Sequence, residues 1–530
     1  MSALIEVYNK RNKKINKIEK LKTEDTPLNF YSNLETICNN GYENLTSAQS
    51  KHFLKCFGIY DKGSFDEFAI RIRIPYGQLN LIQANMFADL AKTYGRNRID
   101  LTTRSQIEMR HLKLNELPTV LNGLLSVGIN TYQTAGDNIR GVITSPFDGY
   151  SKTSMITCKN LVDEIQDVFL KKKEYIGSLP RKFNVGILGD IVNDCNIYGQ
   201  DCCFALAKKE EEIGFNLYLG GKVGIQASPT NIFVKKEQVA EIFETLLNIF
   251  IEYGFRDNRN KNRLNYFIEE LGLETLEKIL NEKLNNKLQS AGTALVKENY
   301  IIKDSSITKL KNNKSAIYFP VPAGLFNSRD LHCLTKLMNE YNGIIRLTHE
   351  QSFFLIVDEN YEKNIKDSLI FKKYDAYNNV FFRNQIACAG LNECSFGVIP
   401  NKLDAIEMAV YLNQHTNVKN GKIRMYWSAC PKGCGVHGVA DIGFEGAKAK
   451  DQNGNPCNGV KIFLGGKATK KILEARQLTK AVTIQFAQKI VENLINMYEK
   501  HKLEDETFEE FDSRFLATLS IQDIQAKVGA

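Results

Sequence analysis

The sequence predicts an α+β protein made of two copies of one unit, packed about a pseudo-twofold axis with a site between them. Three pairs of segments match at nearly one offset, 245–247 residues: FAIRIRIPYG (68–77) with SAIYFPVPAG (315–324), IDLTTRSQ (99–106) with IRLTHEQS (345–352), and FNLYLGGK (215–222) with VKIFLGGK (460–467). Three agreeing matches indicate an internal duplication; the alternative is coincidence among short β-rich segments. Strands and helices mix without a regular βαβ rhythm, which favours α+β.

Local patterns predict the elements in order. Residues 1–60 are expected to form a mostly helical, basic arm before the first copy. The alternation in AIRIRI predicts a strand, as do VGIL and FNLYLGG, whereas 79–94 and 234–253 have helical periodicity. The Lys-rich stretch 282–314 is expected to connect the copies, and the charged residues 506–530 to be peripheral.

Composition limits the class of protein. With 530 residues, the chain is long enough for three or four domains. Its 69 Lys and Arg exceed its 61 Asp and Glu by a net charge of +8, which fits an acidic partner or an anionic ligand without demanding nucleic acid. No uncharged apolar run is long enough to span a membrane. Twelve Cys without a signal peptide predict a cytoplasmic protein, in which thiols are free, metal-bound or catalytic.

Four thiols are close in sequence in the second copy, as Cys388-x5-Cys394 and Cys430-x3-Cys434, the latter pair in WSACPKGCGVHG. Four thiolates in a Gly-rich loop can hold an iron–sulfur cube or a structural zinc ion. Zinc ribbons usually have two residues between paired cysteines, so spacings of five and three favour a larger cluster. Zinc and unrelated buried thiols remain as alternatives. The other eight Cys lack such pairing and are expected to be core residues.

C-x5-C followed by C-P-x-x-C-G resembles the signature of the siroheme-dependent nitrite and sulfite reductases. RIRIPYG, LTTRSQ, GDNIR, LPRKFN and GGK follow in that family's order, so the resemblance spans about residues 60–470. It implies siroheme and a [4Fe–4S] cluster, with Cys434 as the bridge to the siroheme iron. The implied cluster ligands are Cys388, Cys394, Cys430 and Cys434. Two residues depart from the family's pattern and add charge: Lys432 replaces a usual Asn, and Glu108 a usual Gln.

The resemblance implies five segments, which form three compact regions around a central cofactor site. Residues 1–60 are the basic N-terminal arm and 61–130 the first ferredoxin-like half-domain. Residues 131–300 are the first siroheme-binding domain, with the anion-binding cations. Residues 301–370 are the second ferredoxin-like half-domain, and 371–530 the second siroheme-binding domain, with the cluster cysteines.

Cations are expected around both ligands, because siroheme carries carboxylates and the substrates are oxyanions. The residues that the resemblance places around the anion are Arg71, Arg140, Lys182 and Asn184. Those that it assigns to siroheme carboxylates are Thr102, Arg104 and Arg181. It further implies turn and cofactor-shell roles for Asp137 and Asn138. The role of Arg73 stays open, and His437 is either a proton-relay or axial residue or a solvated loop residue.

The resemblance implies a monomeric enzyme that reduces nitrite to ammonia with six electrons. No flavin or nicotinamide fingerprint is present, so the expected donor is reduced ferredoxin. Asn184 favours nitrite, because the sulfite-type pattern has a second Lys at this position. The alternative on the same scaffold is a ferredoxin-dependent sulfite reductase. From another class, the rival is a nucleic-acid-binding protein with a structural zinc ion and the basic arm Lys10–Lys22.

Overall fold

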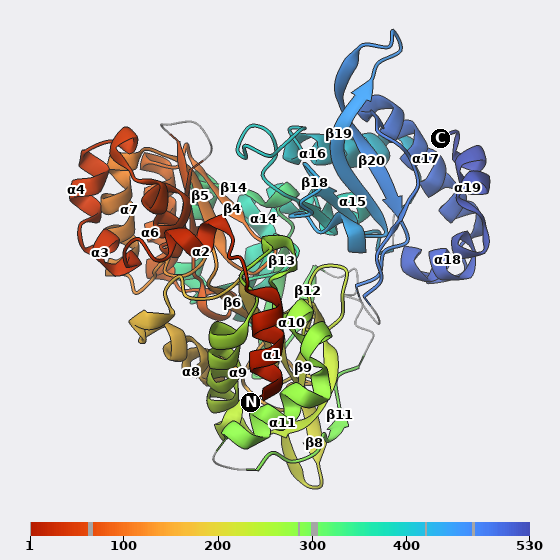
Figure 1. Cartoon of the computed structure of the whole chain (residues 1–530). Coiled ribbons are helices and arrows are strands. Elements are labelled where there is room, and N and C mark those ends of the chain that lie inside the picture. Colours follow the sequence, from red (N-terminus) through yellow and green to blue (C-terminus); the bar gives the residue numbers. More distant parts are fainter. Residues whose placement is uncertain (1, 62–66, 285–286, 298–305, 419–420, 469–471) are drawn as a thin grey trace.

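Three lobes meet at the centre of the molecule, each with its own hydrophobic core (Figure 1). The computed structural model describes residues 2–61, 67–284, 287–297, 306–418, 421–468 and 472–530. Helices and four sheets in these ranges, two of them antiparallel and two mixed, confirm the α+β class. No helix of the described ranges is long and apolar enough to cross a bilayer.

The first lobe joins the two half-domains in one core, which holds Ile70 and Phe87 from the first copy and Phe319 and Leu334 from the second. One sheet has the order β1(Ile59–Asp61)-β2(Phe68–Ile72)-β5(Ile107–Leu112)-β4(Arg98–Leu101)-β14(Leu325–Asn327). The other has the order β12(Ile307–Lys309)-β13(Lys314–Phe319)-β16(Phe353–Asp358)-β15(Ile344–Leu347)-β3(Gln78–Leu79). The flanking helices include α6(Leu81–Thr93), α7(Leu117–Ser126) and α12(Ser328–Tyr341).

The two copies exchange their equivalent short strands. β3 follows the turn Pro75–Gly77 and joins the second copy's sheet, where Gln78 pairs with Arg346. β14 follows the equivalent turn Pro322–Gly324 and joins the first copy's sheet, where Leu325 pairs with Asp100. This reciprocal exchange is what a pseudo-twofold axis requires, and it binds the half-domains into one body.

The second and third lobes repeat one sheet pattern. In each, three parallel strands continue into antiparallel ones. The second lobe has β6(Ile139–Ile143), β7(Phe183–Leu188), β8(Cys202–Lys209), β9(Glu212–Leu219) and β10(Ser228–Val234), with helices α8(Lys159–Leu170), α9(Val239–Tyr253), α10(Leu264–Leu271) and α11(Leu273–Lys283). The third has β17(Gln385–Ala387), β18(Met425–Ser428), β19(Ile442–Lys450), β20(Pro456–Leu464) and β21(Arg476–Gln477), with helices α16(Lys402–His415), α17(Ile484–His501), α18(Phe508–Arg514) and α19(Ile521–Val528).

Several local expectations are confirmed and others are corrected. The helix expected over 79–94 is α6, whereas the helix expected over 234–253 begins only at Val239, after β10. The N-terminal segment is helical as expected, but it is packed against two lobes: Leu4 lies in the second core, and Phe30 and Phe53 in the first.

The C-terminal residues are not peripheral, contrary to expectation. Phe508, Phe511, Leu516, Ile524 and Val528 are buried in the third core. These apolar residues recur at helical spacing among charged ones, so α18 and α19 each bury one face while the charges remain in water.

Candidate active site

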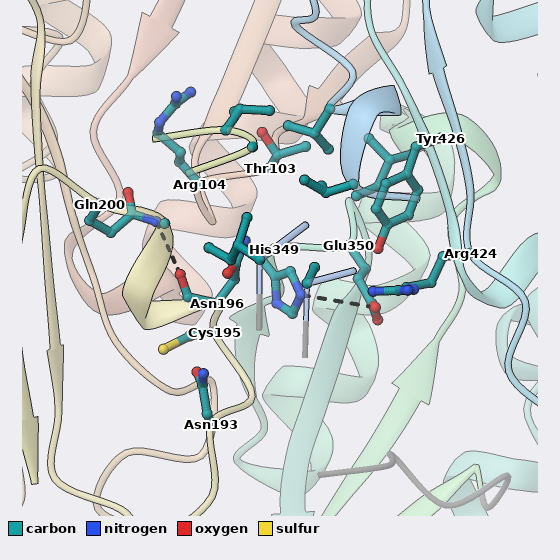
Figure 2. A pocket seen from close by; sticks show the side chains of 18 of the residues that line it. Thr103, Arg104, Asn193, Cys195, Asn196, Gln200, His349, Glu350, Arg424 and Tyr426 are labelled. Carbon is teal, nitrogen blue, oxygen red and sulfur yellow. Dashed lines mark hydrogen bonds and ion pairs between the residues drawn. The ribbon is translucent and has the colours of Figure 1, made fainter. Parts of the chain in front are cut away.

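A cavity lies where equivalent loops of the two copies meet. It encloses about 1110 Å³, including its open mouth. Thr103 and Arg104 follow β4, and His349 and Glu350 follow the equivalent strand β15 (Figure 2). The loop 193–200 before β8 and the loop 436–439 before β19 also line the cavity. Because both copies supply matching loops, the cavity lies close to the pseudo-twofold axis.

Three cations of the first copy gather beside this cavity without acidic partners. Within the described ranges, no Asp or Glu forms an ion pair with Arg104, Arg140 or Lys182. Burial, followed by the charge of Arg71, lowers the pKa of Arg140 to about 9 and that of Arg104 to about 10. Burial also lowers the pKa of Lys182 well below its ordinary value, and Arg140 and Arg104 add to the effect. These cations are partly buried, and partly buried cations without acidic partners favour an anionic ligand.

Arg71 lies beside this cluster and is held by Glu108. The two residues face each other across β2 and β5, and Arg71 Nε donates to Glu108 Oε1 at 2.8 Å. The guanidinium of Arg71 also lies 5.3 Å from the centre of the Tyr60 ring. Glu108 therefore forms an ion pair with Arg71, which a neutral Gln could not do.

Arg181 takes part in a buried ion network around Asp137, which is only 1% exposed. Asp137 Oδ1 accepts from Arg181 Nη1 at 3.3 Å and from Arg259 Nη2 at 2.8 Å, and Lys22 Nζ lies 3.5 Å from Oδ2. Although burial disfavours its charge, Lys22 and Arg259 hold the pKa of Asp137 well below its usual range. Asn138 is buried and accepts from the Gly177 N–H, which fixes the local turn.

Asn184 is tied to a second buried acid. Both its backbone N–H and its Nδ2 donate to Asp201 Oδ2, at 2.9 and 3.2 Å, and Arg263 Nη2 donates to the same oxygen at 2.7 Å. The buried Asn184 Oδ1 has no hydrogen-bond partner in the described part of the chain. Thr102 Oγ1 accepts from the backbone N–H groups of Arg104 and Gln106, at 3.3 and 3.2 Å, and so shapes the turn that carries Arg104.

The equivalent positions of the second copy carry either an acid or a cation that is paired with acids. Glu350, which matches Arg104 in the repeat, lies 3.8 Å from Lys422 Nζ. Arg424 immediately precedes β18, as Lys182 immediately precedes β7, but it pairs with Asp441 at 2.5 Å and with Glu509 at 2.6 Å. At these matching positions of the described chain, the first copy therefore has cations without acidic partners and the second does not.

The four expected cluster cysteines lie in loops at the carboxyl ends of neighbouring parallel strands. β17 ends at Ala387 and β18 at Ser428, so Cys388 and Cys430 emerge at the same edge of the sheet. Burial, with smaller effects of Cys434 and Cys394, raises the pKa of Cys388 to about 11. Burial raises the pKa of Cys430 as well, and the same two thiols add to it. Cys434 and Cys394 therefore lie within electrostatic range of both Cys388 and Cys430.

Hydrogen bonds and close backbone packing fix the conformation of this thiol loop. Cys388 Sγ accepts from the Ala429 N–H at 3.2 Å and from Asn401 Nδ2 at 3.4 Å. Gly435 packs so closely that a Cβ atom would lie 1.8 Å from the Trp427 carbonyl oxygen. In the described ranges, no three Cys, His, Asp or Glu side chains are close enough to hold a single metal ion.

The thiol loop faces the cations of the other copy. Arg104 is close enough to Cys434 for that thiol to raise its pKa against the lowering caused by burial. Lys432, within the CPKGC loop, lies with Arg140 and Arg181 around a second cavity, and its Nζ is 2.8 Å from the centre of the Phe396 ring. Cations from one copy and thiols from the other thus border the same central region.

Arg73 and His437 contact other parts of the protein and lie apart from the cluster of cations. Arg73 Nη2 donates to the carbonyl oxygens of Tyr132 and Ile139, both at 2.9 Å, which joins a loop to β6. Buried His437 has its Nε2 3.4 Å from Glu445 and packs on Phe463. Neither residue lies among the unpaired cations.

Several site residues lack a sequence signal that could have revealed them. Lys22, Arg259 and Arg263 come from helical segments far along the chain and outside the repeated motifs. Each contacts Asp137 or Asp201 only because segments far apart in the sequence come together in the folded chain. By contrast, Thr103 stands in the repeated LTTRSQ motif, whose match with LTHEQS indicated this loop.

Comparison with known proteins agrees with this geometry. Residues 135–288 and 381–526 match the family described as "Nitrite and sulphite reductase 4Fe-4S domain". Residues 60–127 match the "Nitrite/Sulfite reductase ferredoxin-like half domain". The first of these families covers more than half of the chain and matches it in both copies, which confirms the duplication.

Similar proteins span nearly the whole chain. A "Ferredoxin–nitrite reductase" of Synechococcus elongatus is 30% identical over 470 residues, 86% of this chain and 91% of that protein. The chloroplastic ferredoxin–nitrite reductase of Spinacia oleracea is 27% identical over 86% of this chain and 80% of its own. The solved structure of the Mycobacterium tuberculosis NirA protein has the same fold, with a TM-score of 0.87, 22% identity and coverage of 97% and 98% of the two chains.

The fold and the site together define a duplicated redox protein with a cationic cavity and a thiol loop. The chain belongs to the nitrite and sulphite reductase family, and it is an oxidoreductase.

Proposed function

We propose that this oxidoreductase reduces nitrite to ammonia with six electrons from reduced ferredoxin, at a siroheme coupled to a [4Fe–4S] cluster. One observation carries the proposal: partly buried cations of the first copy, without acidic partners in the described chain, lie beside the thiol loop of the second. The relatives named for ferredoxin-dependent nitrite reduction support the substrate and the donor.

The residues present suit both cofactors. Arg104, with Arg181, would bind carboxylates of siroheme, because guanidinium groups without enough acidic partners need anions. Cys388, Cys394, Cys430 and Cys434 would hold the cluster, with Cys434 as the shared ligand. A cube binds each cysteine through a different iron atom, so it suits four neighbouring thiols that do not converge on one point. Together, the cofactors supply electrons and an iron site for the anion.

The side chains of this protein bind the anion and supply protons. Arg140 and Lys182 stabilise its oxygen atoms, because neither cation is neutralised by an acid of the described chain. Arg71 adds a third cation, held in place by Glu108. The lowered pKa of Lys182 makes its ammonium group a stronger acid than an exposed lysine, so Lys182 is suited to donate a proton to an oxygen atom of the substrate.

Nitrite is favoured over sulfite by charge. Nitrite is a monoanion with two oxygen atoms, whereas sulfite near neutral pH is largely a dianion with three. Asn184 places a neutral amide beside the expected anion site. A cation at the same position would be better suited to sulfite. Its Nδ2 donates to Asp201, which is fully buried and paired with Arg263. Sulfite reduction on the same scaffold is the alternative function.

We further propose a monomer in a reducing compartment such as the cytoplasm. Both copies of the repeat border one cavity within a single chain, so a second subunit is not needed to complete it. None of the twelve cysteines, each within the described ranges, forms a disulfide, which suits a reducing compartment.

A visible absorption spectrum of the purified protein, with its iron and acid-labile sulfide content, tests the proposal. We expect a strong Soret band, red bands and iron in excess of the siroheme iron. A colourless protein that contains zinc would contradict the proposal and support the rival class. Turnover of nitrite with reduced ferredoxin then tests the substrate and the donor.

A further inference from the structure

Glu108 is a buried carboxylate that bridges two arginines. It lies opposite Arg71 in the register of β2 and β5, and Arg110, two residues along β5, lies on the same face of the strand. Glu108 Oε1 accepts from Arg71 Nε at 2.8 Å, and Oε2 pairs with Arg110 Nη2. Both oxygen atoms are engaged, and the residue is only 7% exposed.

Arg110 also pairs with two other acids, which it shares with Arg98, whereas the acid that pairs with Arg71 is Glu108. Arg110 Nε lies 2.8 Å from Asp100 Oδ2 and 3.3 Å from Glu393 Oε2. Arg71 forms an ion pair with Glu108 and with no other acid of the described residues. Although burial opposes ionisation, Arg110 and Arg71 lower the pKa of Glu108 to about 2, so it is charged at physiological pH.

The ring of Tyr60 and the carboxylate of Glu108 limit the orientations open to the Arg71 guanidinium. The carboxylate also offsets one positive charge beside the anion pocket. Of the three cations expected around the anion, Arg140 and Lys182 have no acidic partner and Arg71 has one. Without Glu108, none of these three cations would have an acidic partner.

We infer that Glu108 is a positioning residue that orients Arg71 and offsets its charge, so that the pocket prefers a monoanionic oxyanion to a dianionic one. This inference deepens the proposed function and rests on it. Each added positive charge attracts a dianion more than a monoanion, and the difference is large where water is excluded. Glu108 thereby contributes to the preference for nitrite over sulfite.

The test measures dissociation constants of nitrite and sulfite from the purified holoenzyme by titration of the visible spectrum. For Glu108→Gln we expect the ratio of the two constants to shift toward sulfite by about tenfold or more. Asp100→Asn is the matched control, because Asp100 pairs with Arg110 and not with Arg71. We expect it to keep the wild-type ratio within about twofold.

A second variant separates charge from position. Glu108→Asp keeps the charge but shortens the side chain, so we expect weaker binding of both anions with little change in their ratio. An unchanged ratio in Glu108→Gln, or an equal shift in Asp100→Asn, would overturn the inference. If Glu108→Gln does not fold, a shift toward sulfite in Glu108→Asp would overturn it. Failure of the proposed function is distinct, since the wild type itself would then not bind or reduce nitrite.

Discussion

At the scale of single residues, ion pairing separates two copies that share one fold. Lys182 and Arg424 both stand directly before an inner strand, but Arg424 is neutralised by Asp441 and Glu509. The charged neighbours that most strongly lower the pKa of Lys182 are all arginines. A bound anion therefore relieves repulsion at Lys182, whereas Arg424 gains little from one.

Substitution of Lys182 tests its roles in binding and proton donation. Burial, with Arg140 and Arg104, lowers the pKa of Lys182, so kcat should fall as pH rises through a value below that of an ordinary lysine. We expect Lys182→Met to reduce kcat/KM for nitrite by about 100-fold or more. Lys182→Arg keeps the charge and should lose the alkaline limb of the pH profile. An unchanged limb in Lys182→Arg would show that another group donates the proton.

Cysteine substitution tests the cluster assignment. We expect Cys434→Ser to lose iron and siroheme absorption, because serine is a poor ligand for this cluster. Cys457→Ser is the control, since Cys457 is a partly buried thiol on β20, outside the thiol loop. Iron analysis and visible spectra of both variants check the prediction. Equal iron loss in both, or in Cys457→Ser alone, would refute the assignment.

At the scale of elements, two parallel strands and a closely packed turn form the thiol loop. β17 and β18 deliver Cys388 and Cys430 to one edge of their sheet. The turn after β18 then brings the Gly435 backbone against the Trp427 carbonyl, and the Gly435 N–H donates to Ser428 Oγ at 3.0 Å. The sulfur positions therefore depend on a turn that has no room for a side chain.

Gly435→Ala tests this dependence. The added Cβ atom would lie 1.8 Å from the Trp427 oxygen, so the backbone must move. We expect the free energy of unfolding to fall by about 2 kcal/mol or more and the iron content to drop. Gly438→Ala is the matched control, because its Cβ atom would meet nothing closer than 3.7 Å. Denaturation and iron analysis of both variants provide the readout, and equal behaviour would contradict this view of the turn.

Elements with a strong periodic pattern could be predicted from the sequence, and very short ones could not. The alternation around Arg71 and the periodicity of 79–94 predicted β2 and α6. β3 and β14 have two and three residues, too few to show a period, so their exchange between sheets was not foreseen. The Asp137 and Asp201 networks were missed as well, because their cations come from distant helical segments.

At the scale of the whole molecule, the duplication places two specialised copies around one cavity. The first supplies unpaired cations and the second supplies thiols, whereas the half-domains of both share one core. The repeat and the C-x5-C and C-P-x-x-C-G motifs sufficed to predict this arrangement. The ion pairs that neutralise Arg424 in the second copy could not be predicted from the sequence, because Asp441 and Glu509 lie 17 and 85 residues from it.

The net charge of +8 leads to a prediction about the electron donor. A positively charged protein should attract an acidic ferredoxin electrostatically. At physiological ionic strength, salt screens this attraction beyond about 8 Å. We expect added salt to lower turnover with reduced ferredoxin more than turnover with a small uncharged reductant. Steady-state rates over a range of salt concentrations measure this. Equal salt sensitivity with both donors would remove the argument for electrostatic docking.

The central claim is that the two copies together build a nitrite-reducing centre, and the stoichiometry of the reaction tests it most directly. Purified holoenzyme would be supplied anaerobically with reduced ferredoxin and either nitrite or sulfite, and the ammonium, the sulfide and the oxidised ferredoxin would be counted. The account predicts six ferredoxins oxidised for each ammonium formed, with a higher kcat/KM for nitrite than for sulfite. Faster conversion of sulfite to sulfide, or no ammonium from nitrite by a protein that carries both cofactors, would contradict it.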